Sequence, residues 1–424
     1  MWPNSAIDGI FLQPNLFFLA LKRKIINDPV YGFISIRHAF ILELIDHPWF
    51  QRLRRIAQLG LSHLVYPGAL HNRFQHAIGA MHLMQNAIDE LRLKGNEISD
   101  QEEVSLLCAI LLHDIGHGPF SHALEYTIAS EVHHERISSL MMNRLNEHFN
   151  GKLIMAIAIF NNEYPKKFLH QLVSSQLDMD RLDYLARDSF FSGVVEGQVG
   201  SERILKMLDV VDDQLVVEEK GIYSIEKFIV ARRFMYWQVY LHKTVLSAEF
   251  MLVNALRRAQ VLARAGATLH CSPALHYFLY NQVKQEELIS KPEALQHYAS
   301  LDDFDIAAAL KVWQHHDDRV LAMIAINMVN RSLFKIEIQR TPFDASRVSC
   351  EIERISAKYN FTKEEASYFV IQSSVDNRAY NSQYDVIRIL MKDGSVRDAA
   401  EVSDHLNIAA LSSVVEKHFV AYLR

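Results

Sequence analysis

The chain has 424 residues, of which 44 are Lys or Arg and 50 are Asp or Glu, so its formal net charge is -6. Half of the residues are hydrophobic and 22% are charged, a balance that excludes a long disordered protein and supports a large buried core. The mild acidity excludes a general attraction for nucleic acid, so a polyanion would need a local basic pocket. No apolar run approaches the roughly 20 residues of a membrane helix, so we expect no membrane partner.

Glycine and proline are scarce, with 15 and 10 residues, which favours helices over a turn-rich β-sandwich or barrel. The sequence therefore predicts a mainly α fold, with a helical core and a smaller α+β C-terminal region. The cysteines Cys108, Cys271 and Cys350 are too widely spaced for a disulfide framework and fit a reducing compartment. We expect a cytoplasmic protein.

Composition along the chain predicts three parts. We expect residues 1–24 to be an N-terminal lead-in, residues 25–270 to form the helical core, and residues 271–424 to form the α+β appendage. The best-marked helix of the core starts with capping-box residues, because Glu102 and Glu103 follow Ser99 and Asp100 by three positions. The run 104–112 is apolar on nearly every face, so this helix should be buried, and the Gly- and Pro-containing segment 116–119 should end it.

Weaker patterns predict the other elements. A small hairpin is expected within 214–223, centred on 218–221. In the C-terminal part we expect strands at 333–339 and 384–391, a turn at 392–395, and one or two terminal helices over 402–423.

The histidines are unevenly distributed. Of 21 in the chain, eight fall between positions 71 and 134: His71, His76, His82, His113, His117, His122, His133 and His134. A single histidine is more often packed or exposed than a ligand. His113 and Asp114, however, stand at the end of the apolar helix, which delivers an imidazole and a carboxylate to the edge of the core. A buried carboxylate needs a partner, and a metal ion is a common one.

A His-Asp doublet alone supplies two ligands, whereas a hydrolytic metal site has at least three protein ligands and a position for water. Upstream, His71 and His76 flank Arg73. Downstream, Asp180, Tyr184 and Asp188 are spaced at i, i+4 and i+8, which places them on one helical stripe. For that segment alone a solvated face with salt bridges is the favoured interpretation, so the residues by themselves leave the ligand set open.

Taken in order, these segments resemble the H…HD…D pattern of the HD-domain phosphohydrolases. Within that family they look like the SAM-and-HD-domain deoxynucleotide triphosphohydrolases of vertebrates and their bacterial relatives, and the resemblance is clear from about residue 24 to residue 243. It covers the segments 26–32, 50–60, 66–69, 71–76, 113–122 and 178–188. No SAM domain is expected ahead of the HD domain.

The resemblance implies a role for each matching residue. The metal ligands would be His76, His113, Asp114 and Asp180, for an ion that the residues do not identify (Fe, Mn, Zn, Ni or Mg). The catalytic group that relays protons to the leaving oxygen would be His122, Glu125 and His134. The substrate would be bound by Gln58, Leu59, Arg73, His117, Arg181, Tyr184, Asp188, Arg232, Tyr236 and Tyr240. Of these, Arg73, His117 and Arg181 would neutralise its phosphates. Tyr236 replaces a histidine of the vertebrate enzyme, so base preference stays open.

The function implied is hydrolysis of a deoxynucleoside triphosphate (dNTP) at the α-phosphorus, giving deoxynucleoside and triphosphate. The alternatives are an HD-type phosphohydrolase or phosphodiesterase acting on another nucleotide, and a nucleotide-sensing module with a vestigial metal site. The resemblance also suggests a homodimer or larger homo-oligomer and a nucleotide activator, with counterparts of activator contacts at Asp46, Arg54, Arg203, His242 and Lys243. The paired carboxylates of Glu218 and Glu219 argue against the same activator. Control of nucleotide pools and defence against phage are both compatible roles.

Overall fold

The computed structural model describes residues 24–120, 127, 133–377, 380–381, 385–404 and 413–424. Two catalytic candidates, His122 and Glu125, and nearly all of the lead-in over 1–24 lie outside these residues. Within them the fold is mainly α with small sheets, so the predicted fold class is confirmed. No helix of the described part is both long and apolar enough to cross a membrane.

The elements of the described residues follow in chain order. The α-helices are α1 (Ala39–Asp46), α2 (Pro48–Gln51), α3 (Arg73–Leu93), α4 (Asp100–Leu112), α5 (His134–His148), α6 (Ile154–Phe160), α7 (Lys167–Val173), α8 (Met179–Ser192), α9 (Ser201–Met207), α10 (Ile222–Met235), α11 (Lys243–Arg264), α12 (Pro273–Tyr280), α13 (Gln285–Ser290), α14 (Pro292–Ser300), α15 (Asp303–Trp313), α16 (Arg319–Val329), α17 (Ala345–Tyr359), α18 (Lys363–Ser367) and α19 (Ala399–Val402). Shorter helical turns are η1 (Arg52–Arg55), η2 (Ser62–Leu64), η4 (Val195–Gly197), η5 (Glu219–Gly221) and η6 (Tyr236–Tyr240). The strands are β1 (Lys24–Asp28), β2 (Gly32–Ile36), β3 (Leu208–Val211), β4 (Gln214–Glu218), β5 (Lys335–Gln339), β6 (Val370–Asn377), β7 (Arg388–Leu390), β8 (Val396–Asp398) and β9 (Val415–Tyr422).

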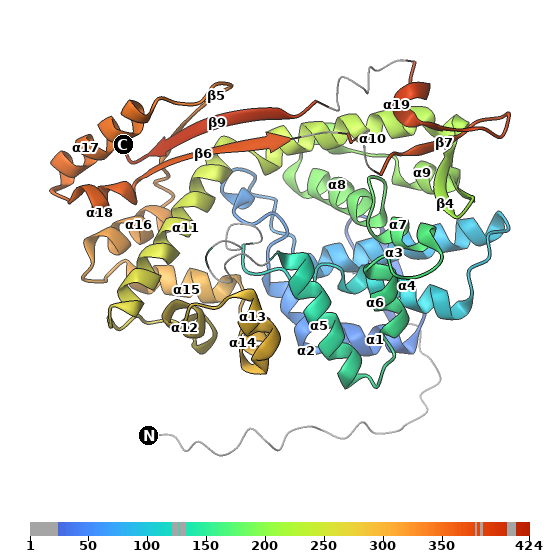
Figure 1. Cartoon of the computed structure of the whole chain (residues 1–424), viewed down its shortest axis with the longest axis horizontal. Coiled ribbons are helices and arrows are strands. Elements are labelled where there is room, and N and C mark those ends of the chain that lie inside the picture. The colour runs from blue at the N-terminus through green and yellow to red at the C-terminus, as the bar shows by residue number, and fades with distance from the viewer. Residues whose placement is uncertain (1–23, 121–126, 128–132, 378–379, 382–384, 405–412) are drawn as a thin grey trace.

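Helix α3 is the centre of the core and packs against both α4 and α8. Figure 1 shows α3, α4, α6, α7 and α8 gathered at one side of the molecule and α11, α12, α15 and α16 at the other. Strands β6 and β9 run side by side near α10. The first turns of α3 and α8 and the end of α4 meet inside the first group of helices.

Helix α4 begins as predicted, with Ser99 as the N-cap and Glu102 closing the capping box. It ends at Leu112, earlier than the Gly- and Pro-containing segment suggested. Beyond it the backbone bonds span three residues, from Ile115 N to Leu112 O and from His117 N to Asp114 O, so the chain tightens into a turn. This turn still leaves the side chain of His117 beside Asp114.

The small sheets correct two predictions. Strand β4 is present, but its hairpin partner is β3, and the turn lies at Asp212 and Asp213. Both residues have positive φ, the backbone conformation that a two-residue hairpin loop favours. The expected hairpin at 218–221 was therefore misplaced. The expected terminal helices over 402–423 were wrong for the end of the chain, since β9 is a strand that pairs with β5 and β6 on its two sides. Residues 405–412 of that stretch lie outside the described residues.

Other C-terminal predictions agree better. Strand β5 falls inside the predicted 333–339, β7 falls inside 384–391, and 392–395 forms the turn between β7 and β8. Because β7 pairs in parallel with β4, the C-terminal region completes a sheet begun in the core. The boundary near residue 270 stays a prediction.

Gly79 allows α3 and α8 to approach closely. A Cβ at this position would lie 2.0 Å from Asp183 Oδ1 and 2.1 Å from Arg187 Nη2, both in buried side chains of α8. We expect Gly79→Ala to lower the free energy of unfolding by roughly 1–3 kcal/mol, the usual cost of overpacking a core. Urea unfolding would measure it. Gly200→Ala is the control, because a Cβ there has no heavy atom within 4 Å and φ is -81°. Equal stability of the two variants would contradict the close packing.

Candidate metal centre

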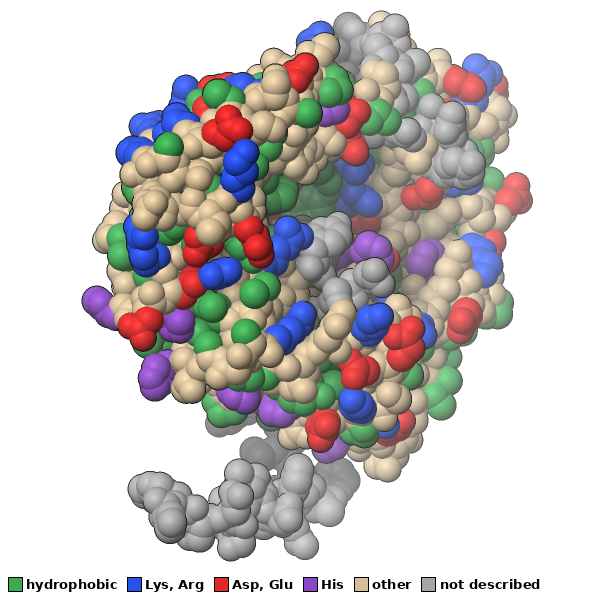
Figure 2. Space-filling view, turned by 60° about the vertical axis from the view of Figure 1, so that its left-hand side comes forward, with side chains coloured by type: hydrophobic (Ala, Val, Ile, Leu, Met, Phe, Trp, Pro, Cys, Tyr) green, Lys and Arg blue, Asp and Glu red, His purple; other side chains and the backbone are tan. Residues whose placement is uncertain are grey.

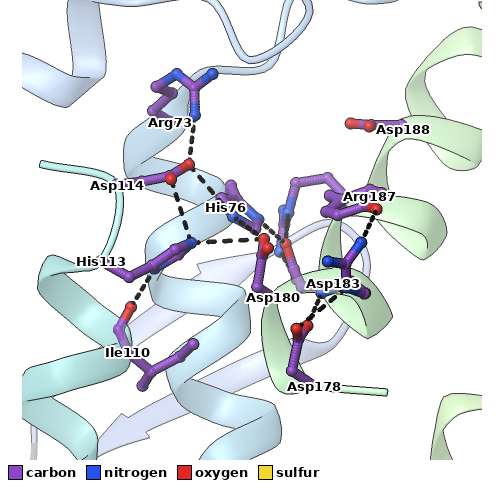
Figure 3. A network of polar contacts seen from close by, with 12 residues as sticks. Arg73, His76, Ile110, His113, Asp114, Asp178, Asp180, Asp183, Arg187 and Asp188 are labelled. Atoms are coloured by element: carbon purple, nitrogen blue, oxygen red, sulfur yellow. Dashed lines mark hydrogen bonds and ion pairs between the residues drawn. The ribbon is translucent and has the colours of Figure 1, made fainter. Parts of the chain in front are cut away.

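Four side chains converge from three helices. His76 comes from the first turns of α3, whose N-terminus is fixed by a capping box between Asn72 and Gln75. His113 and Asp114 follow the last residue of α4, and Asp180 lies in the first turn of α8. Figure 3 shows these side chains pointing toward one common point. The structure thus brings together the four residues that the sequence suggested as ligands.

The distances within this group are short. His76 Nε2 lies 3.1 Å from Asp180 Oδ1 and 3.8 Å from Asp114 Oδ2. His113 Nε2 lies 3.4 Å from Asp114 Oδ1 and 3.5 Å from Asp180 Oδ1. One ligand atom each from His76, His113 and Asp114 falls within 4.8 Å of the others, close enough for a single ion to contact all three.

The orientation of the two imidazoles tests whether the group fits a metal. His76 Nδ1 donates to Asp183 Oδ2 at 2.7 Å, and His113 Nδ1 donates to the carbonyl of Ile110 at 2.6 Å. Each ring therefore keeps a proton on Nδ1 and directs Nε2 to the centre, where this atom can bind either a metal ion or a second proton. Both Nε2 atoms are buried and have no hydrogen-bond partner. A buried nitrogen is costly to leave unpaired, so the donor set fits a divalent cation.

The electrostatics of the centre agree with this fit. Burial lowers the pKa of His76, but the carboxylates of Asp180 and Asp183 outweigh burial and raise it to about 10. Burial raises the pKa of Asp114, but His117, His113 and Arg73 hold it well below its usual range. The negative potential that would hold a proton on His76 Nε2 would equally hold a metal ion there.

Behind His76 lies a buried ion-pair chain that the sequence reading did not single out. Asp183 accepts from Arg187 through both its oxygens, each at 3.0 Å, and Arg187 Nη1 donates to Asp28 Oδ2 at 2.8 Å. All three side chains are almost fully buried. The i, i+4 spacing of Asp183 and Arg187 was visible in the sequence, but only the fold shows that they face His76 and the turn after β1.

Residues suggested for phosphate binding surround the same point. Arg73 Nη1 donates to Asp114 Oδ2, and His117 Nδ1 lies 3.2 Å from Asp114 Oδ1. The rings of His117 and His134 stack with centroids 3.9 Å apart. Burial and the neighbouring Arg73 hold the pKa of His117 well below its ordinary value, so the imidazole is neutral. His117 therefore resembles a hydrogen-bonding group more than the cation that the sequence suggested.

A second group extends from Asp180 along α8 to the end of α10. Arg181 Nε donates to the carbonyl of Ser175 at 2.5 Å, and its guanidinium lies 3.5 Å from the hydroxyl of Tyr184. The ring of Tyr240 makes edge contacts with Tyr184 and Tyr236, at centroid distances of 6.1 and 5.1 Å. The structure thus joins these aromatic residues to the metal-centre candidates.

The outer members of this group are also in place. The Tyr240 hydroxyl donates to Asp188 Oδ2 at 2.8 Å, and His71 Nε2 donates to the other oxygen of Asp188 at 2.7 Å. The guanidinium of Arg232 lies over the ring of Tyr236. The wall formed by Tyr184, Asp188, Arg232, Tyr236 and Tyr240 is therefore continuous.

Gln58 and Leu59 belong to a loop that lies against the start of α3. Gln58 N donates to the carbonyl of His71, and Arg73 N donates to the carbonyl of Ile56. The side-chain oxygen of Gln58 is buried and has no hydrogen-bond partner. The two residues are therefore adjacent to Arg73, as a shared site requires.

A cavity of about 620 Å³ opens on the centre, and its lining includes His113, Asp114, His134, Asp180 and Arg181. Its volume falls in the range of small-molecule sites. The molecule is hollowed on the face shown in Figure 2, where histidine and Lys or Arg side chains appear around the hollow.

The suggested activator contacts come from α1, η1, α9 and the start of α11. Asp46 at the end of α1 pairs with Lys24 at 3.5 Å, and Arg54 packs over the ring of Phe74. Arg203 on α9 donates to the carbonyl of Lys220, while His242 and Lys243 begin α11. Glu218 is bound at 2.6 Å by both Lys94 and Lys220, so its negative charge is largely compensated.

Comparison with known proteins identifies the family. A model of the HD domain matches residues 73–188, and a model of the HD-associated region matches residues 199–268. The crystal structure of a phosphohydrolase from Bacteroides thetaiotaomicron is 54% identical, covers 95% of this chain and 100% of its own, and superposes with a TM-score of 0.93. The chain belongs to the HD-domain phosphohydrolases. It is thus an enzyme of a metal-dependent hydrolase family.

Among HD-domain relatives, the uncharacterised protein YwfO of Bacillus subtilis is 30% identical over 90% of this chain and 88% of its own length. The Dictyostelium discoideum homologue of the deoxynucleoside triphosphate triphosphohydrolase SAMHD1 is 33% identical over 56% of this chain. The match spans 49% of that relative. The chain therefore covers only about half the length of the relatives named as deoxynucleoside triphosphate triphosphohydrolases.

The ion-pair chain behind His76 leads to a testable prediction. Asp183→Asn keeps an acceptor for His76 Nδ1 but removes the charge that orients the ring and balances Arg187. We expect divalent-metal affinity to fall about 10–100-fold, the usual effect of losing such a carboxylate. Metal titration of the apoprotein by calorimetry would measure it. The control is Asp89→Asn, on the helix α3 that also carries His76, where Asp89 forms an exposed pair with Arg37. An unchanged affinity in Asp183→Asn would show that the chain does not tune the centre.

Proposed function

We propose that this HD-domain phosphohydrolase is a deoxynucleoside triphosphate triphosphohydrolase, which hydrolyses a dNTP at the α-phosphorus to give a deoxynucleoside and triphosphate. The observation that carries hydrolysis is the pair of buried, unpartnered Nε2 atoms of His76 and His113 facing Asp114 and Asp180. The SAMHD1-type relatives support the choice of a dNTP. We propose His76, His113, Asp114 and Asp180 as the metal ligands. When bound, a divalent ion supplies Lewis acidity toward phosphate and acidifies a water molecule.

The other residues would bind and orient the substrate. Arg73 and Arg181 carry permanent positive charge beside the ligands and suit the phosphates of a nucleotide. Neutral His117 would offer a hydrogen bond to a phosphate oxygen. His134, stacked on His117, is proposed to pass a proton to the leaving oxygen together with His122 and Glu125.

The wall that contains Tyr184 and Tyr240 is proposed to hold the nucleoside. Tyr240 is fixed by its hydrogen bond to Asp188, and Asp188 is fixed in turn by His71. A tyrosine held in this way presents a rigid surface to a sugar and can reject a 2′-hydroxyl by contact. Gln58, Leu59, Arg232 and Tyr236 complete the proposed pocket.

Product analysis tests this function directly. The protein is incubated with each dNTP and NTP, singly and in mixtures, with Mn²⁺ or Mg²⁺, and the products are separated by chromatography. Deoxynucleoside with intact triphosphate is the expected result, and faster turnover in mixtures would reveal a nucleotide activator. If metal is bound and no triphosphate is cleaved while a monophosphate or a cyclic nucleotide is, the substrate assignment is wrong.

The ligand assignment has its own prediction. Asp114→Ala removes a carboxylate that faces both imidazoles, so we expect turnover to fall at least about a thousandfold through loss of several kcal/mol of transition-state stabilisation. Metal content should fall in parallel while the far-ultraviolet circular dichroism stays that of the wild type. Asp100→Ala, at the fully exposed start of α4, is the matched control. Full activity of Asp114→Ala with metal bound would refute the assignment.

A further inference from the structure

The loop 115–120, which follows His113 and Asp114, is hydrogen-bonded to residues that lie outside both regions matched by the family models. Arg52 of η1 is completely buried. Its Nη2 donates to the carbonyls of Ile115 and His117, at 3.0 and 2.6 Å. Its Nη1 donates to the carbonyls of Leu301 and Tyr298, at 2.9 and 3.3 Å. One guanidinium thus joins the loop 115–120 to the segment 298–303.

A second contact runs between the same two segments. The Tyr298 hydroxyl donates to the carbonyl of Gly116 at 2.9 Å. A Cβ at Gly118 would lie 2.9 Å from that hydroxyl, so the loop and the tyrosine are in close contact. The loop carries His117, which lies beside Asp114 and is stacked on His134.

Asp303 connects two loops through its two carboxylate oxygens. Its Oδ1 accepts from the backbone N–H of Phe120 at 2.7 Å, and its Oδ2 accepts from the backbone N–H of Ala57 at 2.8 Å. The two amides belong to different loops: one ends the segment that carries His117, and the other precedes Gln58 and Leu59. A single carboxylate therefore sets the distance between the two loops.

We infer that Asp303, at the first position of α15, is a positioning residue that holds the loops 57–60 and 115–120 in register around the substrate site. Only an ionised carboxylate offers an acceptor to both amides, because an amide side chain has one oxygen and one NH₂ donor. This role rests on the phosphohydrolase function proposed above, but the geometry itself is independent of which nucleotide is cleaved.

The test is Asp303→Asn, with Asp305→Asn as the matched control. Both changes remove one charge from the first turn of α15. Asp305 only caps the helix through the N–H of Asp302, a bond that an asparagine oxygen preserves. In Asp303→Asn one of the two loop amides loses its acceptor and faces an NH₂ donor. We expect more deuterium uptake in peptides covering 57–60 and 115–120, with unchanged metal content.

Kinetics with dATP supply the second readout. We expect the KM of Asp303→Asn to rise roughly tenfold, since one hydrogen bond to a charged acceptor is lost and the loop that carries Gln58 shifts. A loss of folded protein would lower kcat and leave KM unchanged. Exchange equal to that of Asp305→Asn, or raised exchange with an unchanged KM, would overturn the inference. If the wild type cleaves no dNTP, singly or in mixtures, the proposed function fails, and the exchange result alone decides the role of Asp303.

Discussion

The structure depends on the burial of two imidazoles that each leave one nitrogen unpaired. His76 and His113 lie inside the helical core with Nδ1 bonded and Nε2 directed at two carboxylates. Isolated buried charges are unstable in a protein interior, so the buried carboxylate of Asp114 needs a cationic partner. Arg73 satisfies part of this need at Asp114, and a divalent ion at the centre would satisfy the remainder. The packing of α3, α4 and α8 therefore creates a point in the core that favours a cation.

The same helices also determine how rigid the centre is. The absence of a side chain at Gly79 lets α8 bring Asp183 and Arg187 against α3. Arg187 then reaches Asp28, whose other oxygen accepts from the backbone of Val30 and Tyr31 in the turn after β1. The N-terminal hairpin is thus linked to the orientation of His76 through three buried side chains. A change in that hairpin would therefore affect the orientation of His76 without altering any of the four proposed ligands.

The sequence predicted the helical class, the capped helix before the HD pair, and a cluster of four residues that the fold does bring together. The helix predictions succeed because they depend on local pattern: apolar continuity in 104–112 and the capping chemistry of Ser99 and Glu102. The four-residue cluster came instead from the resemblance to the HD-domain family, because the residues by themselves left the ligand set open. The ion-pair chain behind His76 depends on helix packing, and its residues look like ordinary surface pairs in the sequence. Strand β9 was misread as helix because its identity comes from pairing with β5 and β6 rather than from its own residues.

The electrostatics also change what the resemblance implied for one residue. A histidine next to a phosphate is readily taken as a cation, yet His117 is buried beside Arg73, and that neighbour disfavours a second positive charge. The positive charge near the centre is therefore concentrated on the arginines, whose guanidinium groups stay protonated. Any hydrogen bond from the neutral His117 depends on where its ring is placed, and the hydrogen bond from Arg52 to its carbonyl sets that place. Burial lowers the pKa of Arg52 to about 10, so this guanidinium stays charged. Arg52 donates to carbonyls of both the HD loop and the segment 298–301. The position of His117 therefore depends on residues that lie outside the regions matched by the family models.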